Sequence, residues 1–215
     1  MKIFLDTADT SLIKKHFATG LIDGITTNPT LIKKSGRDPL EVYQELKDLG
    51  VKDISMEVVG DADEMINEGK GLYDTFGDCC TVKVPCSPDG LRACKELSDL
   101  NIRVNVTLIF SQTQAILASK AGAKYVSPFV GRVDDNSFGG ICLVKDIVNV
   151  FKEHFVRTEV LAASIRNVRD VGRLFEHGAE IVTMPPAVFE KMYNHILTDK
   201  GLELFQADWE SVHNT

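Results

Sequence analysis

The sequence is poor in the features that mark secreted or membrane proteins. It has no apolar segment long enough for a signal peptide or a membrane span, and its N-terminus, MKIFLDTAD, reaches acidic residues almost at once. Its five cysteines make an odd count, and their spacing fits neither a paired zinc motif nor a disulfide framework. We therefore expect a cytoplasmic protein whose thiols stay reduced.

Linkers, low-complexity tracts and concentrated blocks of charge are also absent. The formal net charge of -7 is spread along 215 residues, which argues against nucleic acids and anionic membranes as general partners. The five histidines are too scattered to suggest a metal site. A chain of this length supports one sizeable core, so we predict a single domain over residues 1–215.

What is present is a regular alternation of short β-rich runs with longer amphipathic ones. Eight runs are strand candidates: KIFLD, DGITTN, DISMEVV, CTVKVP, RVNVTLI, YVSPFV, EVLAAS and EIVTMP. Helix candidates between them cover residues 11–19, 61–76, 88–100, 111–121, 143–155 and 168–177. Asp61 and Ser111 are suitable helix caps.

Eight strand–helix units predict an α/β fold, a single (β/α)8 TIM barrel with short loops. The rival is a doubly wound open sheet, but no G-x-G-x-x-G follows the first strand to support it. Beyond the barrel we predict a C-terminal helical extension over residues 200–215, because Leu202, Phe205 and Trp209 recur near helical spacing. Its apolar stripe can cap the chain's own barrel.

Strand parity separates two faces, because alternate residues of a strand point to opposite sides of a sheet. In CTVKVP, Val82 and Val84 share the side that packs against helices, and Lys83 lies on the other side. Positions inferred to face inward are Asp6, Asn28, Ser55, Glu57, Thr81, Asn105, Thr107, Ser127, Phe129 and Ser164. Positions inferred to face outward on the fifth strand are Val104, Val106 and Leu108.

The inward polar groups lie toward the C-terminal ends of their strands, where barrel enzymes assemble their active sites. Each has a structural alternative: Asp6 as a cap, Asn28 as a turn residue, and Ser164 as a hydroxyl satisfied by backbone. Their convergence in one barrel mouth is harder to explain structurally, since an unpaired buried polar group costs several kcal/mol. The pattern therefore indicates a site.

Lys83 is the residue with the clearest chemistry. Burial of a lysine in an apolar interior disfavours the charged ammonium and increases the free amine, which attacks carbonyl groups. The resulting iminium allows a carbon–carbon bond to break through an enamine. Glu57 on the neighbouring strand can act as the acid/base, through a water held by Thr107. The alternative is that Glu57 serves only as the salt-bridge partner of Lys83.

Two arginines follow inward-facing strand ends. Arg132 and Arg166 each carry a guanidinium fork suited to a terminal phosphate monoester, and the hydroxyl of Ser164 can add a donor. Alternatively they make surface ion pairs, Arg132 with Asp134 or Asp135 and Arg166 with Asp170.

These motifs resemble the transaldolase family, in particular its small subfamily that also contains the fructose-6-phosphate aldolases. The resemblance spans nearly the whole chain and rests on FLDTAD, GITTNPTLI, VKVP, NVTLIFS, SPFVGRVDD and LAASIRN. It implies that Lys83 forms a Schiff base with a ketose phosphate, that Asp6 takes the proton next to the breaking bond, and that Glu57 is the acid/base. It further implies that Asn28, Asn105 and Ser127 hold donor hydroxyls. No cofactor or metal is implied.

The resemblance also separates two kinds of member. Aldolase members carry Gln at the position of Glu57 and Tyr at the position of Phe129, whereas transaldolases carry Glu and Phe, as this chain does. Arg166 is likewise the transaldolase choice. The resemblance thus implies transfer of a dihydroxyacetone unit between sugar phosphates. It also implies a homo-oligomer, a pentamer or decamer, in which subunits exchange the C-terminal helix. The alternatives are a fructose-6-phosphate aldolase and a non-catalytic sugar-phosphate-binding barrel.

Overall fold

The structure, a computed structural model, describes residues 1–213, so the last two residues of the predicted C-terminal helix lie outside the described residues. All eight predicted strands are present, several of them trimmed at their ends. They are β1 (Lys2–Asp6), β2 (Gly24–Thr26), β3 (Ile54–Glu57), β4 (Cys80–Pro85), β5 (Val104–Ile109), β6 (Tyr125–Pro128), β7 (Glu159–Ala162) and β8 (Ile181–Met184). Each pairs in parallel with the next, and β8 pairs with β1, which closes the barrel. The predicted (β/α)8 fold is confirmed.

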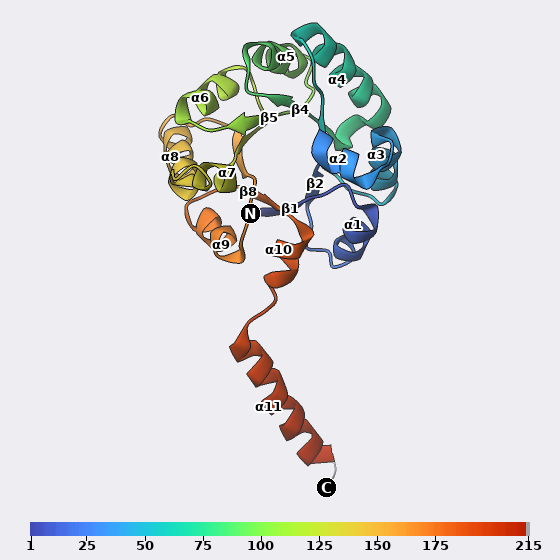
Figure 1. Cartoon of the computed structure of the whole chain (residues 1–215), viewed down its shortest axis with the longest axis vertical. Coiled ribbons are helices and arrows are strands. Elements are labelled where there is room, and N and C mark those ends of the chain that lie inside the picture. The colour runs from blue at the N-terminus through green and yellow to red at the C-terminus, as the bar shows by residue number, and fades with distance from the viewer. Residues whose placement is uncertain (214–215) are drawn as a thin grey trace.

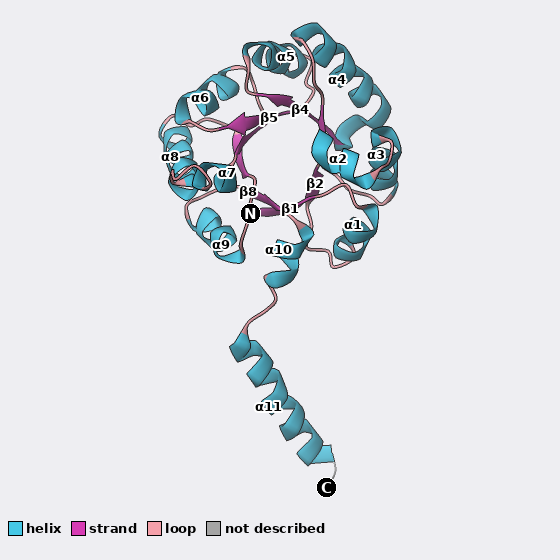
Figure 2. Cartoon of the chain, in the orientation of Figure 1, coloured by secondary structure: helices cyan, strands magenta, loops and turns pink. Residues whose placement is uncertain are grey.

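Helices surround the strands on all sides (Figures 1 and 2). They are α1 (Thr10–Phe17), α2 (Pro29–Ser35), α3 (Pro39–Asp48), α4 (Ala62–Phe76), α5 (Pro88–Asp99), α6 (Gln112–Lys120), α7 (Val130–Asp134), α8 (Gly140–Glu153), α9 (Val168–Glu176), α10 (Pro186–Lys191) and α11 (Ile196–His213), with a 3-10 turn η1 (Gly77–Cys79). The predicted caps are confirmed: Asp61 forms a capping box with Glu64, and the side chain of Ser111 accepts a bond from the backbone of Gln114. Helix α8 begins three residues before the predicted start.

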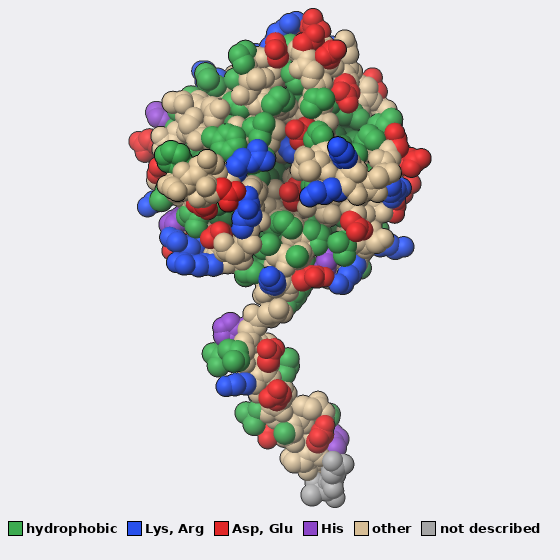
Figure 3. Space-filling view, in the orientation of Figure 1, with side chains coloured by type: hydrophobic (Ala, Val, Ile, Leu, Met, Phe, Trp, Pro, Cys, Tyr) green, Lys and Arg blue, Asp and Glu red, His purple; other side chains and the backbone are tan. Residues whose placement is uncertain are grey.

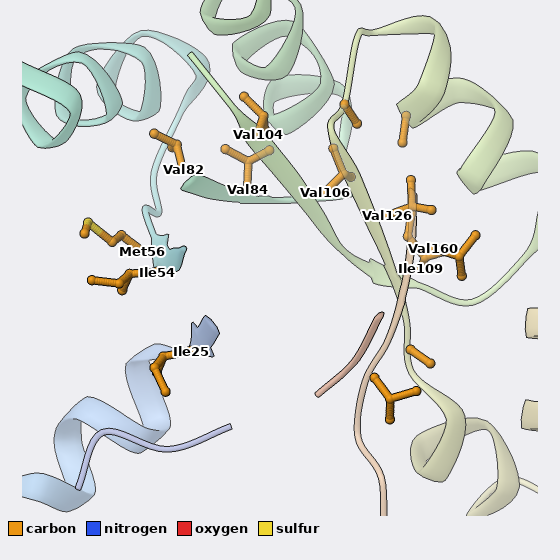
Figure 4. Close-up of a cluster of buried hydrophobic side chains, with 14 of the residues drawn as sticks. Ile25, Ile54, Met56, Val82, Val84, Val104, Val106, Ile109, Val126 and Val160 are labelled. Carbon is orange, nitrogen blue, oxygen red and sulfur yellow. The ribbon is translucent and has the colours of Figure 1, made fainter. Parts of the chain in front are cut away.

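The main hydrophobic core fills the space between the barrel and its helices. Outward-facing strand residues such as Val82, Val84 and Val106 are fully buried there (Figure 4). Burial on this side of every strand stabilises the barrel through the removal of apolar area from water. The side chains on the opposite side of each strand point into the lumen of the barrel and are not part of this core.

A separate apolar cluster fills the lumen at the N-terminal ends of the strands. Phe4 and Tyr125 meet edge to face with ring centres 6.4 Å apart, and Leu161, Ala163 and Ile181 pack with them. Gly24 is required beside it, because a Cβ there would lie 2.6 Å from the ring of Phe4. This cluster closes the bottom of the barrel, so a ligand enters the lumen only from the C-terminal ends.

Helix α11 contradicts the alternative in which the C-terminal helix caps its own barrel. It points away from the barrel (Figure 1), and none of its described residues is buried. Leu202, Phe205 and Trp209 are between 62% and 70% exposed. Along residues 1–213, no helix is long and apolar enough to cross a membrane.

Strand β5 departs from the predicted alternation at its C-terminal end. The register against β6 shifts between Val106 and Ile109, and Leu108 has a left-handed backbone with φ 58°. Ile109 takes the buried outward position, and Leu108 is half-buried beside the barrel mouth. The expectation that Leu108 faces outward with Val106 is therefore wrong, because the irregularity moves its side chain to the mouth.

Candidate active site

Parallel register places several polar side chains at one level of the lumen. Glu57 on β3 is paired with Lys83 on β4, and Lys83 is paired with Asn105 on β5. Asp6 on β1 is paired with Thr26 on β2. Because paired residues of neighbouring strands point to the same side of a sheet, all five groups face the mouth together.

Lys83 and Glu57 form a buried pair. Nζ of Lys83 lies 2.9 Å from Oε2 of Glu57 and donates a hydrogen bond of 2.9 Å to the carbonyl of Thr27. Lys83 is only 5% exposed. The ion pair between Glu57 and Lys83 is thus present, as the structural alternative for Glu57 expects. The same short distance also allows a proton to move between the two groups. The surroundings of Nζ are polar, which corrects the expectation of an apolar interior.

Asp6 completes the charged centre from the other side of the lumen. Burial raises the pKa of Asp6 above its usual value, and this is the dominant influence. The charge of Lys83 and a 2.8 Å hydrogen bond from Thr26 lower that pKa, whereas the charge of Glu57 raises it. Asp6 is no helix cap, since the side chain of Asp9 caps α1, so the structural alternative for Asp6 is wrong.

Asn105 and Ser127 are joined to each other and to Ser55. The Ser127 hydroxyl donates to Oδ1 of Asn105 over 2.7 Å, and Nδ2 of Asn105 donates to the hydroxyl of Ser55 over 3.2 Å. All three residues are buried. In this arrangement Oδ1 of Asn105 accepts, and the second hydrogen on Nδ2 is left for a ligand.

Thr107 has a free hydroxyl in this setting. Its Oγ1 is buried and makes no hydrogen bond within residues 1–213. A buried hydroxyl without a partner is costly unless a ligand or water uses it. Thr107 lines the same hollow as Glu57 and Lys83, which suits it to hold a water molecule between them.

Asn28 has both of the roles considered for it. Its Oδ1 caps α2 by accepting a bond from the backbone of Leu31 over 2.9 Å, as expected for a turn residue. It also lines the cavity at the mouth. Because Oδ1 is occupied, the Nδ2 group of Asn28 is the part of the side chain that remains as a donor to a ligand.

A cavity of about 110 Å³ gathers most of the predicted site. Its lining comprises Asp6, Thr26, Asn28, Lys83, Asn105, Thr107, Ser127, Phe129, Arg132, Ala163 and Ser164. An adjoining hollow of about 400 Å³ shares Lys83 and Arg132 with it and adds Glu57 and Leu108. In the space-filling view, Lys and Arg side chains lie beside the central hollow of the barrel, with Asp and Glu side chains among them (Figure 3).

The two arginines are held differently. The guanidinium carbon of Arg132 lies 4.8 Å from the ring centre of Phe129, and no carboxylate in residues 1–213 pairs with it. Arg166 lies outside the cavity lining and forms a 2.6 Å ion pair with Asp135. The pairing alternatives named the wrong partners, because Asp135 pairs with Arg166 and Asp170 accepts from Asn167.

Ser164 follows β7 with a left-handed backbone, φ 60°. Its carbonyl accepts a bond from the backbone of Gly131 over 2.9 Å, which fixes the turn beside Arg132. Its hydroxyl lines the cavity and makes no hydrogen bond within the part of the chain that the structure describes. The alternative that backbone satisfies this hydroxyl is therefore wrong.

Sequence reasoning assigned no site role to five residues that shape the site: Thr26, which lines the cavity and bonds Asp6, and four others. Thr183 on β8 contacts Thr26, Ser55 holds Asn105, Leu108 lines the outer hollow, and Phe110 packs edge-on against Phe129 with ring centres 5.8 Å apart. Strand parity puts Ser55 and Thr183 on the inward side, so these two were within reach of the pattern. Leu108 was not, because the irregularity in β5 has no glycine or proline to mark it.

Fold and site together define a (β/α)8 barrel with a lysine-centred polar site at the C-terminal ends of its strands. Residues 3–215 match the family described as Transaldolase/Fructose-6-phosphate aldolase. The chain therefore belongs to this family and is an enzyme of it. The resemblance seen in its motifs is confirmed.

Relatives of known name cover almost all of the chain. A probable transaldolase of Caulobacter vibrioides is 52% identical over 99% of this chain and 98% of its own length. Probable transaldolases of Cereibacter sphaeroides and Nitrosopumilus maritimus are each 50% identical, over 100% and 99% of this chain and 98% and 96% of their own lengths. A solved structure of thiamine phosphate pyrophosphorylase from Pyrococcus furiosus aligns with TM-score 0.57 at 15% identity over 85% of each chain, which shows a shared barrel fold alone.

Proposed function

We propose that this enzyme is a transaldolase, a transferase that moves a dihydroxyacetone unit between sugar phosphates. The donor is sedoheptulose 7-phosphate or fructose 6-phosphate, and the acceptor is erythrose 4-phosphate or glyceraldehyde 3-phosphate. The observation that carries the proposal is the Lys83–Glu57 pair, which shares the barrel mouth with Asp6. The probable transaldolases among its relatives support it. This assignment places the enzyme in the pentose phosphate pathway of the cytoplasm.

Lys83 starts the reaction as a nucleophile. Its Nζ passes a proton to Glu57 across their 2.9 Å contact and adds to the C2 carbonyl of the donor. Glu57 then returns a proton to the C2 hydroxyl, which leaves as water and gives an iminium. The free Oγ1 of Thr107 holds the water through which Glu57 returns the second proton.

Asp6 serves in the bond-breaking step. It takes the proton of the C4 hydroxyl while the C3–C4 bond breaks, and the electron pair of that bond moves into the enamine and neutralises the nitrogen. The aldose phosphate leaves, and the acceptor aldehyde enters. In the reverse sequence the enamine attacks the acceptor, Asp6 returns its proton to the new hydroxyl, and water releases the product from Lys83. No redox step and no further reactant is required.

The remaining cavity residues bind the substrate. The donor groups of Asn28 and Asn105 and the hydroxyl of Ser127 face hydroxyls of the three-carbon unit. Arg132 and the hydroxyl of Ser164 bind the terminal phosphate, joined by Arg166 when it leaves Asp135. Phe129 forms the apolar wall. Charge-assisted bonds of this kind are the strong ones in phosphate recognition.

Borohydride trapping tests the proposal. Incubation with fructose 6-phosphate and borohydride should reduce the imine and fix a three-carbon adduct on Lys83, found by peptide mapping. Lys124→Met is the control and should still give the adduct. Lys124 is an ion-paired lysine like Lys83, but it is only partly buried and pairs with Glu159 away from the mouth. An adduct on another lysine, or none, would remove the central claim.

A pair of parallel assays separates the alternatives. Fructose 6-phosphate with erythrose 4-phosphate measures transfer, and fructose 6-phosphate alone measures cleavage. Faster transfer supports the transaldolase, whereas equal or faster cleavage identifies a fructose-6-phosphate aldolase. No turnover in either assay identifies a non-catalytic sugar-phosphate-binding barrel.

The protomer is proposed to work as a homo-oligomer, a pentamer or decamer. Its support is α11, an 18-residue helix whose apolar side chains have no partner in their own barrel. Most of the stability of a helix in a protein comes from packing of its apolar face, and α11 has no such packing within its own subunit. Packing on a neighbouring subunit would cover it.

A further inference from the structure

A chain of two hydroxyl groups runs behind Asp6. Oγ1 of Thr26 lies 2.8 Å from Oδ1 of Asp6 and 2.7 Å from Oγ1 of Thr183. Thr183 is 2% exposed and does not line the cavity, whereas Asp6 and Thr26 do. Thr183 therefore stands one step behind the residues that a substrate can touch.

Counting protons fixes the direction of this chain. An ionised carboxylate only accepts hydrogen bonds, and a threonine hydroxyl has one proton to donate. With Asp6 ionised, Thr26 gives its proton to Oδ1 of Asp6. The 2.7 Å contact between the two threonines is then a bond in which Thr183 donates to Thr26.

We propose that Thr183 is a positioning residue for Asp6, which it orients and keeps ionised through Thr26. The inference rests on the proposed function, in which ionised Asp6 accepts the proton of the donor's C4 hydroxyl. By donating to Thr26, Thr183 fixes the rotation of that hydroxyl and polarises it as a donor. Oδ1 of Asp6 is thereby occupied, and Oδ2 remains to take the proton and later return it. No proton passes along the two threonines.

The charges around Asp6 set the sign of the effect. Burial and the charge of Glu57 raise the pKa of Asp6, while the charge of Lys83 and the bond from Thr26 lower it. Weakening the bond from Thr26 therefore raises this pKa further. Because Asp6 works in its ionised form, activity is lost as pH falls through the pKa, so the acid limb of kcat/KM moves to higher pH.

Thr183→Val tests the proposal, since valine keeps the shape of threonine and removes only its hydroxyl. We expect the acid limb of kcat/KM to move upward by about 0.3 to 1 pH unit, with a two- to tenfold loss on that limb, the size of a lost neutral hydrogen bond. Thr183→Ser, which restores the hydroxyl, should return the profile close to the original. If Thr183→Val fails to fold, Thr183→Ala against Thr183→Ser gives the same comparison.

Thr81→Val is the matched control. Thr81 is also a buried threonine on the inward side of a strand, but its hydroxyl donates to Asp53. This variant should lower stability and leave the acid limb in place. An equal shift in Thr81→Val, or none in a folded Thr183→Val, overturns the proposal.

Borohydride trapping provides a readout of the step affected. Imine formation precedes the action of Asp6, so in Thr183→Val the ratio of uncleaved to three-carbon adduct on Lys83 should rise. The two proposals fail separately. If the unmodified enzyme gives no adduct on Lys83, the proposed function is wrong, and if it gives the adduct while Thr183→Val changes neither ratio nor profile, only the role of Thr183 is wrong.

Discussion

Removal of each arginine at the mouth should weaken phosphate binding to a different extent. Arg132 stacks on Phe129 at 4.8 Å with no competing carboxylate in residues 1–213. Arg166 is bound to Asp135 over 2.6 Å and must leave it to reach a phosphate. The free energy of breaking that pair is subtracted from the contribution of Arg166 to binding.

The size of the difference follows from the exposure of the pair. A charge-assisted hydrogen bond contributes about 1.5 to 3 kcal/mol, so Arg132→Ala should lower kcat/KM for a phosphorylated donor by about 10- to 150-fold. The side chains of Arg166 and Asp135 are 55% and 52% exposed, and exposed pairs are worth only about 0 to 1 kcal/mol. The loss of kcat/KM in Arg166→Ala should therefore be smaller than the loss in Arg132→Ala by a factor of up to about five. Asp135→Asn should improve binding by a similar factor.

The assay compares fructose 6-phosphate with fructose, using glyceraldehyde as the acceptor in both cases so that no second phosphate is present. The losses should appear in KM for fructose 6-phosphate and be small for fructose. Arg169→Ala is the control, since Arg169 is an exposed arginine on α9. Equal losses for the two donors would refute a phosphate site at Arg132 and Arg166.

Two further predictions concern assembly and stability. Removing residues 196–215, or changing Trp209 to Glu, should convert the homo-oligomer into smaller species in light scattering, and an unmodified chain that is already monomeric would contradict the oligomer. Asp53→Asn should lower the free energy of unfolding by about 1.5 to 3 kcal/mol, because Asp53 accepts bonds from Thr81, Tyr125 and Arg103. This network lies at the end of the lumen opposite the mouth, so kcat of the folded variant should not change. Asp99→Asn, which removes an exposed ion pair, is the control and should change the free energy of unfolding little.

The barrel was predictable because its strands carry two independent signals. Their outward residues are apolar at every second position, as at Val82 and Val84, and most strands are followed by a helix with a side-chain cap, such as Ser87 after β4. A period of two also places Lys83 and Glu57 on one face without knowledge of the structure. The order of the strands then follows from closure, since each strand pairs with its neighbours in sequence and β8 pairs with β1.

Side-chain partners beyond the strand ends were not predictable in the same way. Arg166 and Asp135 come from separate loops, and their pairing depends on how the turn at Ser164 packs on Gly131. The position of α11 was also hidden, because an apolar stripe indicates that a helix is covered but not what covers it. Periodicity in the sequence shows which face of a helix or strand is apolar. The Arg166–Asp135 pair and the position of α11 depend instead on which other part of the protein lies against that face.

Phe129 gives the sharpest test of transfer against cleavage. Its ring is half-buried, lines the cavity and is enclosed by Arg132 and Phe110. In the proposed reaction it offers the three-carbon enamine on Lys83 an apolar wall, so that the enamine would wait for an aldehyde without being protonated and released. Phe129→Tyr adds a hydroxyl that can hold water and pass a proton, and such general acid–base groups contribute about 100-fold or more.

We therefore expect Phe129→Tyr to raise the ratio of cleavage to transfer by at least about tenfold, allowing for imperfect geometry of the new hydroxyl. The substitution keeps the aromatic volume, so the fold should survive. Phe110→Tyr is the matched control, because it makes the same change one ring further from the cavity, which Phe110 does not line. Both activities should be measured on folded protein with fructose 6-phosphate, in the presence and absence of erythrose 4-phosphate. An unchanged or lower ratio in Phe129→Tyr would mean that Phe129 only packs against its neighbours, and the transaldolase assignment would then lose one of its discriminating residues.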